Sequence, residues 1–130
     1  MPPPEPAPTA FTPEERIKIF SIAWLSAAAD DILGSKEKRL LREYRKRLRI
    51  PDASAREIEK LARMRKLRVT LPRRPEAREA FFLTTLRMVG VDRGIPTIER
   101  RLVGKIGTFL GLNATEINGF LRRAENPGTT

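Results

Sequence analysis

Cysteine and histidine are both absent from this sequence of 130 residues. Without cysteine the chain has no disulfides and no thiolate metal sites. Without histidine it lacks the usual general base and the commonest protein ligand for zinc or copper. No Ser–His or Cys–His pair can activate a nucleophile, and the sequence contains no glycine-rich phosphate-binding loop. We therefore expect a protein that is not an enzyme.

Long apolar segments are also missing. No segment reaches the roughly 18 consecutive apolar residues of a membrane-spanning helix. The proline-rich residues 1–10 have neither the basic start nor the apolar stretch of a signal peptide. We expect a cytoplasmic protein with a disordered proline-rich tail over residues 1–11, one helical domain over 12–125 and a frayed tail over 126–130.

Positive charge is concentrated in the middle of the chain, whose net charge is +10. Residues 36–74 carry sixteen basic and five acidic side chains, whereas residues 1–35 have a net charge of −3 and residues 75–130 of +2. Such a block favours an acidic protein, a nucleic acid or an anionic membrane surface as partner, although a solvated helix face would have the same composition. The candidate contact residues are Lys38, Arg39, Arg42, Arg45, Lys46, Arg49, Arg63, Arg65, Lys66 and Arg68.

Hydrophobic spacing predicts about six helices. Thr12 with Glu15 forms a capping box before the first, Ser35 can cap the second, and Ser54 with Glu57 forms a capping box before the third. Gly111 suits a left-handed end of the fifth helix. The predicted helices are about 13–29, 36–48, one after Ser54, 75–89, about 97–110 and one that starts at Asn113.

Apolar residues at three- and four-residue spacing define a predicted core face on each helix. Core packing also explains the aromatic residues better than a ligand site does. The predicted core residues are Ile17, Phe20, Trp24, Ala27, Ala28, Leu40, Leu41, Tyr44, Leu48, Ile58, Leu61, Ala62, Phe82, Leu86, Val89, Ile98, Leu102, Ile106, Phe109, Leu110, Ile117, Phe120 and Leu121, with Phe81 flanking.

The two halves of the sequence share a pattern at an offset of 62 residues. Residues 30–37 and 92–99 both read D-x-x-[I/L]-x-x-x-E, and Leu48-Arg49-Ile50 aligns with Leu110-Gly111-Leu112. Two matches in one register indicate duplication of a three-helix unit. The predicted fold is therefore an all-α, compact bundle of about six helices built as two tandem three-helix repeats.

The repeated pattern resembles the TerB-like family over about residues 14–124. Ala29-Asp30 with Leu33 and Glu37 fits the first copy of the family motif, and Val91-Asp92 with Ile95 and Glu99 fits the second. The glycine that the family has after each aspartate is Asp31 in one copy and Arg93 in the other. The family includes tellurite-resistance TerB proteins and the N-terminal domain of DjlA-type co-chaperones.

This resemblance implies a binding or adaptor domain in a bacterial stress or metal-response assembly, with protein partners. It also implies that acidic loop residues bind a divalent cation such as calcium, which prefers carboxylate and carbonyl oxygens. An alternative role for these residues is in helix caps and turns. The candidate ligands are Asp30, Asp31, Glu37, Asp92 and Glu99.

A second interpretation treats residues 106–121 as a helix-turn-helix in a basic nucleic-acid-binding protein. The helix ends at Gly111, and a second helix follows. The residues that would then face a groove of the nucleic acid and its phosphates are Asn113, Thr115, Asn118, Arg122 and Arg123.

Overall fold

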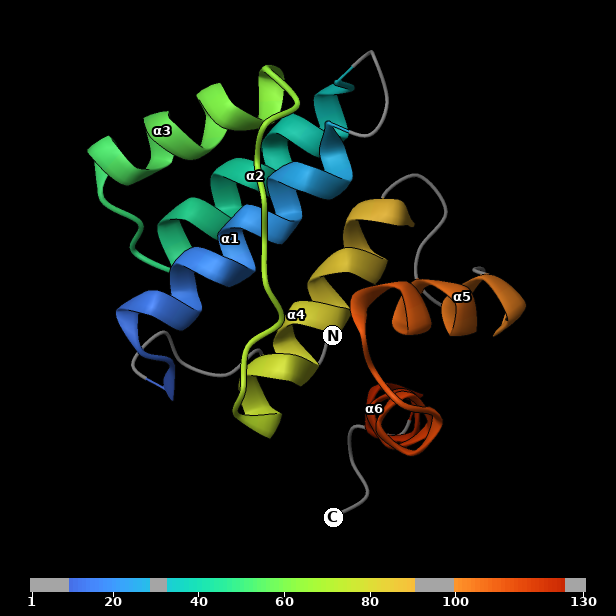
Figure 1. Ribbon diagram of the computed structural model, residues 1–130. Helices are drawn as coiled ribbons and strands as arrows, with labels where there is room; N and C mark the ends of the chain where they lie inside the picture. Colours follow the sequence, from blue (N-terminus) through green and yellow to red (C-terminus); the bar gives the residue numbers. More distant parts are fainter. Residues whose placement is uncertain (1–9, 29–32, 91–99, 126–130) are drawn as a thin grey trace.

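A computed structural model describes residues 10–28, 33–90 and 100–125 (Figure 1). This part of the chain is all-helical, and the prediction of a compact bundle of about six helices is confirmed. None of the described helices is long and apolar enough to cross a membrane. The helices are α1 (Pro13–Ala27), α2 (Ser35–Arg47), α3 (Asp52–Arg63), α4 (Pro75–Val89), α5 (Arg100–Leu110) and α6 (Ala114–Glu125).

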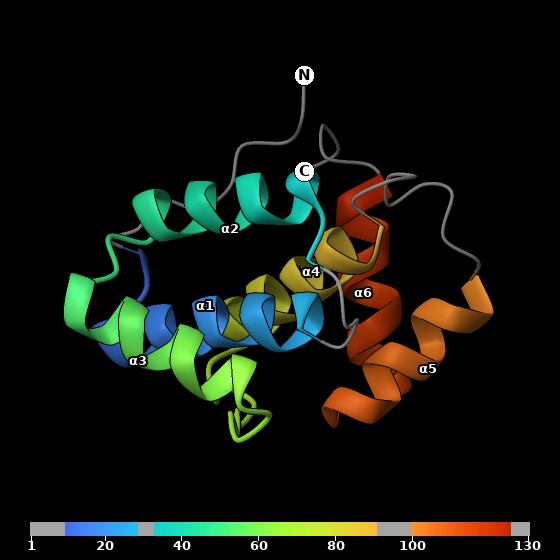
Figure 2. The same cartoon turned by 90° about the horizontal axis from the view of Figure 1, so that it is seen from above.

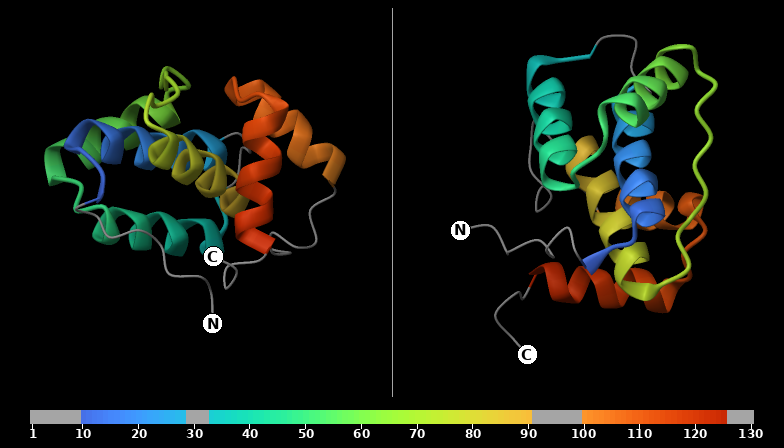
Figure 3. Two further views of the ribbon diagram at one scale, coloured as in Figure 1. Left: turned by 90° about the horizontal axis from the view of Figure 1, so that it is seen from below. Right: turned by 90° about the vertical axis from the view of Figure 1, so that its left-hand side faces the viewer.

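The bundle is built around α1 and α4, which form its most extensive helix–helix contact. Helices α2 and α3 pack on α1, whereas α5 packs on α4 and α6 on α5. Figures 2 and 3 show α2 and α5 on opposite sides of the α1–α4 pair. The two outer surfaces of the bundle, on α2 and on α5, are therefore far from each other.

Two groups of buried side chains stabilise this arrangement. Ala77 and Met88 of α4 join the apolar residues of α1, α2 and α3 in one cluster. Phe82 and Leu86 belong to a second cluster with residues of α5 and α6. Helix α4 thus buries two sides, which explains why both Phe81 and Phe82 are almost fully enclosed.

Two arginines at the start of α4 bind glutamates at the starts of α1 and α6. The Arg74 guanidinium donates to both carboxylate oxygens of Glu15, at 2.6 and 2.7 Å. Arg78 does the same with Glu116, at 2.7 and 2.9 Å. The arginine beside each carboxylate is the main cause that lowers its pKa, to about 2 for Glu15 and in the same direction for Glu116. Three helix ends are therefore joined by charge-assisted hydrogen bonds.

The glutamates also take part in helix capping. Glu15 accepts a hydrogen bond from the Thr12 amide and donates its own amide to the Thr12 hydroxyl oxygen, which confirms the predicted capping box. Asn113 and Glu116 make the equivalent pair of bonds at the start of α6.

The other two predicted caps were wrong. Helix α2 is capped by Gly34, so Ser35 is its first helical residue. Helix α3 begins at Asp52 after Pro51, and Ser54 lies inside its first turn. The fixed φ of Pro51 favours a helix start immediately after it, and this start takes precedence over the Ser54–Glu57 pattern.

The predicted core is correct in most of the described helices, but it was wrong at three positions. Val89 is 46 % exposed, Leu102 42 % and Phe109 86 %. Helix α5 buries Val103 and Gly107 instead. Because Gly107 has no side chain, α5 contacts α6 closely at this residue. The side of α5 that faces the core is therefore the side of Gly107 and Val103, and it does not include Leu102 and Phe109. Ile98 lies outside the described residues.

The connector between α3 and α4 runs over residues 64–74 and passes in front of α1 in Figure 1. Leu67 packs against the first apolar cluster and Leu71 against the second. Pro72 is almost fully buried. The connector is therefore part of the packed domain, because it covers both clusters.

Candidate functional site

Most of the predicted metal ligands lie outside the described residues: Asp30, Asp31, Asp92 and Glu99. Glu37 is described, and it lies half-buried in the first turn of α2. Its Oε2 atom is enclosed and forms no hydrogen bond with any described group. Among the described residues, no three acidic side chains are grouped as metal ligands would be. The carboxylate of Glu37 fits a cation ligand in chemistry, and the metal site stays a prediction.

The ten predicted contact residues for an anionic partner all lie at the surface. Nine are exposed and Arg45 is half-buried. Arg63 at the end of α3 lies over the Trp24 ring, 5.5 Å from its centroid, and pairs with Glu59. Arg65, Lys66 and Arg68 follow on the connector.

Four of the ten gather at the end of α2, and we call them the α2 basic patch: Arg42, Arg45, Lys46 and Arg49. Together with Ile50 they surround an open depression of about 390 Å³. The spacing of three and four residues places Arg42, Arg45 and Lys46 on adjoining turns of α2, and Arg49 follows just after the end of the helix. The sequence predicted that these side chains are exposed. The structure shows in addition that they surround one depression together with Ile50.

The end of α2 fixes the geometry of the patch. Arg49 adopts a left-handed conformation with φ of 52°, and the Ile50 amide donates to the Arg45 carbonyl at 3.1 Å. This is the hydrogen-bond pattern of a Schellman end. The turn directs Ile50 into the core, where it is 6 % exposed, while Arg49 remains at the surface.

The charges of the patch are largely uncompensated. Arg45 pairs with Asp52 of α3. Arg42, Lys46 and Arg49 form no ion pair with any residue that the structure describes. Among the described residues these three cations are uncompensated, and beside the paired Arg45 they produce a compact positive potential that attracts anions.

Helix α2 is anchored beneath this patch by buried residues. Leu41, Tyr44 and Leu48 belong to the first apolar cluster. The Tyr44 hydroxyl accepts a hydrogen bond from Arg87 of α4 at 3.3 Å, and burial raises the pKa of this phenol. The patch therefore lies on the outer side of α2, and the inner side of the same helix is packed in the core.

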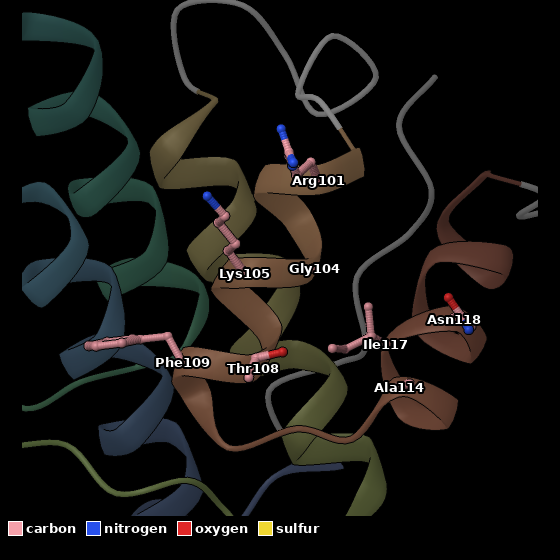
Figure 4. Close-up of a pocket in the computed structure, with 8 residues that line it drawn as sticks. All are labelled: Arg101, Gly104, Lys105, Thr108, Phe109, Ala114, Ile117 and Asn118. Carbon is pink, nitrogen blue, oxygen red and sulfur yellow. The ribbon is translucent and has the colours of Figure 1, made fainter.

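A second surface feature lies between α5 and α6 (Figure 4). An open groove of about 660 Å³ is bordered by both helices. Sequence reasoning missed it because Phe109 was assigned to the core. The i, i+4, i+8 series of Arg101, Lys105 and Phe109, which places two cations on the face of Phe109, is the signal that could have identified an exposed face.

Two of the residues expected to contact nucleic acid in a helix-turn-helix have other roles. The Asn113 side chain accepts the Glu116 amide at 2.8 Å and so caps α6. Arg123 pairs with Glu79 of α4 at 2.6 Å and lies over the Phe120 ring. These intramolecular contacts compete with contacts to bases or phosphates.

The described geometry offers a basic patch and a groove, and neither contains the side-chain pairs of a nucleophilic active site. Comparison with known proteins adds no relative: no family model, no curated protein and no solved structure matches this chain.

Proposed function

We propose that the chain is a non-enzymatic, TerB-like adaptor domain that binds an acidic protein through the α2 basic patch. The observation that carries this proposal is the convergence of three cations without ion-pair partners among the described residues, Arg42, Lys46 and Arg49, around one apolar residue. A rigid helical bundle with a charged surface depression suits binding rather than chemistry.

The shape of the patch favours a protein over a nucleic acid. Its positive charge is compact, and Arg63 of α3, which does not line the depression, is engaged with Trp24 and Glu59. A few carboxylates can fill such a patch, and arginine binds a carboxylate through two parallel hydrogen bonds. The nearly buried Ile50 forms the apolar floor of the depression beside them.

The arrangement of helices supports the TerB-like part of the proposal. The described chain has two apolar clusters, one mainly from α1, α2 and α3 with Ala77 and Met88 of α4, and one from α4, α5 and α6. The aligned segments Leu48-Arg49-Ile50 and Leu110-Gly111-Leu112 both form Schellman-type ends with a left-handed central residue. Similar local structure at positions 62 residues apart is what a duplicated three-helix unit would produce.

The same proposal includes a divalent cation at the acidic loops, with Glu37 as one ligand. The enclosed Oε2 atom of Glu37 supports it, since a buried carboxylate oxygen requires a hydrogen-bond donor or a cation. A ligand that binds only the folded state raises its stability. The midpoint of thermal unfolding in calcium should therefore exceed that in EDTA, and Glu37→Gln should remove the difference. Coincident curves would remove the cation from the proposal.

A binding titration tests the main proposal. The full chain is added to a fluorescent 15-residue peptide rich in Asp and Glu with one central Leu, and separately to a 20-base-pair DNA duplex and a 20-nucleotide RNA. We expect the peptide to bind more tightly at physiological salt. The variant Arg42→Gln/Lys46→Gln should weaken peptide binding about tenfold or more, which corresponds to about 1.4 kcal/mol.

The matched control is Lys60→Gln/Arg73→Gln, which removes the same charge from exposed residues that do not line the depression. Its affinity should stay within about twofold of the parent. Equal losses in both variants would reduce the patch to nonspecific attraction.

The alternative function, a basic helical nucleic-acid-binding protein, is supported by Arg39, Arg42 and Lys46, which recur along α2 at helical spacing and are exposed, with the exposed Arg49 just after the helix end. Tighter binding of DNA or RNA than of the peptide, with affinity that falls steeply with salt, would favour this alternative.

A further inference from the structure

The groove between α5 and α6 combines apolar surface, hydrogen-bonding side chains and positive charge, and it lies far from α2. Its lining residues are Arg101, Gly104, Lys105, Thr108 and Phe109 of α5 with Ala114, Ile117 and Asn118 of α6. At about 660 Å³ it has room for several side chains of a partner, since ligand sites measure roughly 300–1,000 Å³. Figure 4 shows Ile117 pointing from α6 toward α5.

Two glycines one turn apart create the groove. A Cβ at Gly107 would lie 2.4 Å from Ile117 Cδ1 and 2.6 Å from its Cγ1, so the two helices are in close contact there. A Cβ at Gly104 would meet no atom within 4 Å. The helices therefore touch at Gly107 and leave open space beside Gly104, where α5 presents bare backbone.

Apolar surface borders this space. Phe109 is 86 % exposed although it is one of the largest apolar side chains in the domain. Aromatic side chains are enriched in protein interfaces, so an exposed phenylalanine beside a groove fits an interaction surface. Thr108 and Asn118 add groups that can hydrogen-bond to a partner.

The charge of the groove has one sign. Arg101 and Lys105 precede Phe109 at intervals of four residues and so lie on the same face of α5. None of the described lining residues is acidic. A partner with carboxylates near an apolar side chain would be complementary to this arrangement in both charge and polarity.

We propose that the α5–α6 groove binds an acidic segment of another protein, which places an apolar side chain over Gly104 and carboxylates beside Arg101 and Lys105. This inference goes beyond the proposed function, because it adds a second binding surface on the side of the bundle opposite α2 (Figures 2 and 3). A domain with both surfaces can bridge two acidic partners.

Other occupants fit less well. A second copy of this chain that docked through the same face would bring the Arg101 and Lys105 of two grooves together, and like charges at an interface oppose binding. A membrane surface would attract the cations and accept Phe109, but it would not fill the concave space beside Gly104. Both become outcomes of the test.

The test is a selection of displayed 12-residue peptides on the full chain, followed by measurement of the affinity of the enriched peptides. Gly104→Leu fills the groove. Gly119→Leu is the matched control, because Gly119 also lies within a helix, a Cβ there would meet no atom within 4 Å, and the residue does not line the groove. Both substitutions replace a helix-interior glycine with a better helix former. A thermal melt of each variant verifies folding.

We expect enriched peptides to contain Asp or Glu around Leu, Phe or Trp. Their affinity should fall at least tenfold with Gly104→Leu and with Arg101→Ser/Lys105→Ser, and stay within about twofold with Gly119→Leu. The proposal is overturned if no peptide is enriched, or if the enriched peptides bind the Gly104→Leu variant as well as the parent. Self-association removed by Phe109→Ser, or binding to phosphatidylserine vesicles without peptide binding, would also overturn it. Failure here leaves the α2 basic patch unaffected, since none of these variants alters it.

Discussion

The helices before the connector and those after it bury their apolar residues to different extents. Among the described residues, α1 is covered by both α2 and α3 as well as α4, and its Ile19, Phe20 and Ala23 are almost fully enclosed. Helix α5 packs on α4 and α6 but leaves Leu102 and Phe109 at the surface. Similar helix ends thus occur in a closed half and in a more open half. In the two proposals above, the open half binds its partner through apolar and cationic side chains together, whereas the closed half binds mainly through cations.

The largest expected effect is on the free energy of unfolding, and it distinguishes two phenylalanines of the second half. Phe82 is fully enclosed and its ring centroid lies 6.0 Å from that of Phe120, whereas Phe109 is mostly in solvent. Phe82→Ala should lower the free energy of unfolding by about 3–5 kcal/mol, because it removes apolar burial and leaves a cavity. Phe109→Ala should change it by less than about 0.5 kcal/mol.

Urea denaturation followed by circular dichroism measures both values. A loss of more than about 1.5 kcal/mol for Phe109→Ala would mean that this side chain is packed in solution, and the distinction between a closed and an open half would fail.

The second expected effect, of intermediate size, concerns the two arginine–glutamate pairs: Arg74–Glu15, which joins α4 to the first half, and Arg78–Glu116, which lies within the second. The pKa of Glu15 falls from 4.5 to about 2 in the folded state, chiefly because Arg74 donates hydrogen bonds to it. A carboxyl group whose pKa is lowered by folding stabilises the folded state at any pH above its pKa in the unfolded chain. That contribution is lost as the pH falls toward its pKa in the folded protein. Stability should therefore decline between about pH 4.5 and pH 2.

Glu15→Gln should flatten this pH dependence and cost on the order of 1–3 kcal/mol at pH 7, where it leaves Arg74 without its charged partner. Glu116→Gln is the matched variant in the second half and should act in the same direction, since Arg78 lowers the pKa of Glu116 as well. Denaturation midpoints between pH 2 and pH 7 provide the measurement. Parallel curves for the parent and Glu15→Gln would show that this pair contributes nothing to acid stability.

Much of the fold could be predicted from the sequence because the signals are local. The Thr12–Glu15 capping box, the helix over 75–89 and the left-handed Gly111 all rest on residues within one or two turns of each other. The predicted burial failed where packing between helices decides the outcome. The rotation of α5 depends on contact between Gly107 and Ile117, which no spacing within α5 encodes.

The candidate sites were predictable to a smaller extent. Composition identified the basic residues and their exposure, because long charged side chains rarely lie in a core. It could not separate the α2 basic patch from Arg63, whose position over Trp24 depends on how α3 packs on α1. The α5–α6 groove was missed because an apolar residue at helical spacing is normally buried, and Phe109 is an exception.

The smallest expected effect compares the two aligned helix ends. Arg49 and Gly111 both have positive φ, 52° and 96°. Glycine adopts this conformation without strain, whereas other residues do so at a cost. Arg49→Gly should therefore raise the free energy of unfolding by about 0.5–1 kcal/mol, and Gly111→Ala should lower it by about 1 kcal/mol. Arg49→Gly should also weaken binding of the acidic peptide, because it removes one cation of the α2 basic patch while the fold becomes more stable. Denaturation and titration of the same preparation separate the two effects. If Arg49→Gly lowered both stability and binding, the arginine would contribute more to the fold than its left-handed backbone costs, and the α2 end would differ from the Gly111 end in its energetics as well as in its residue.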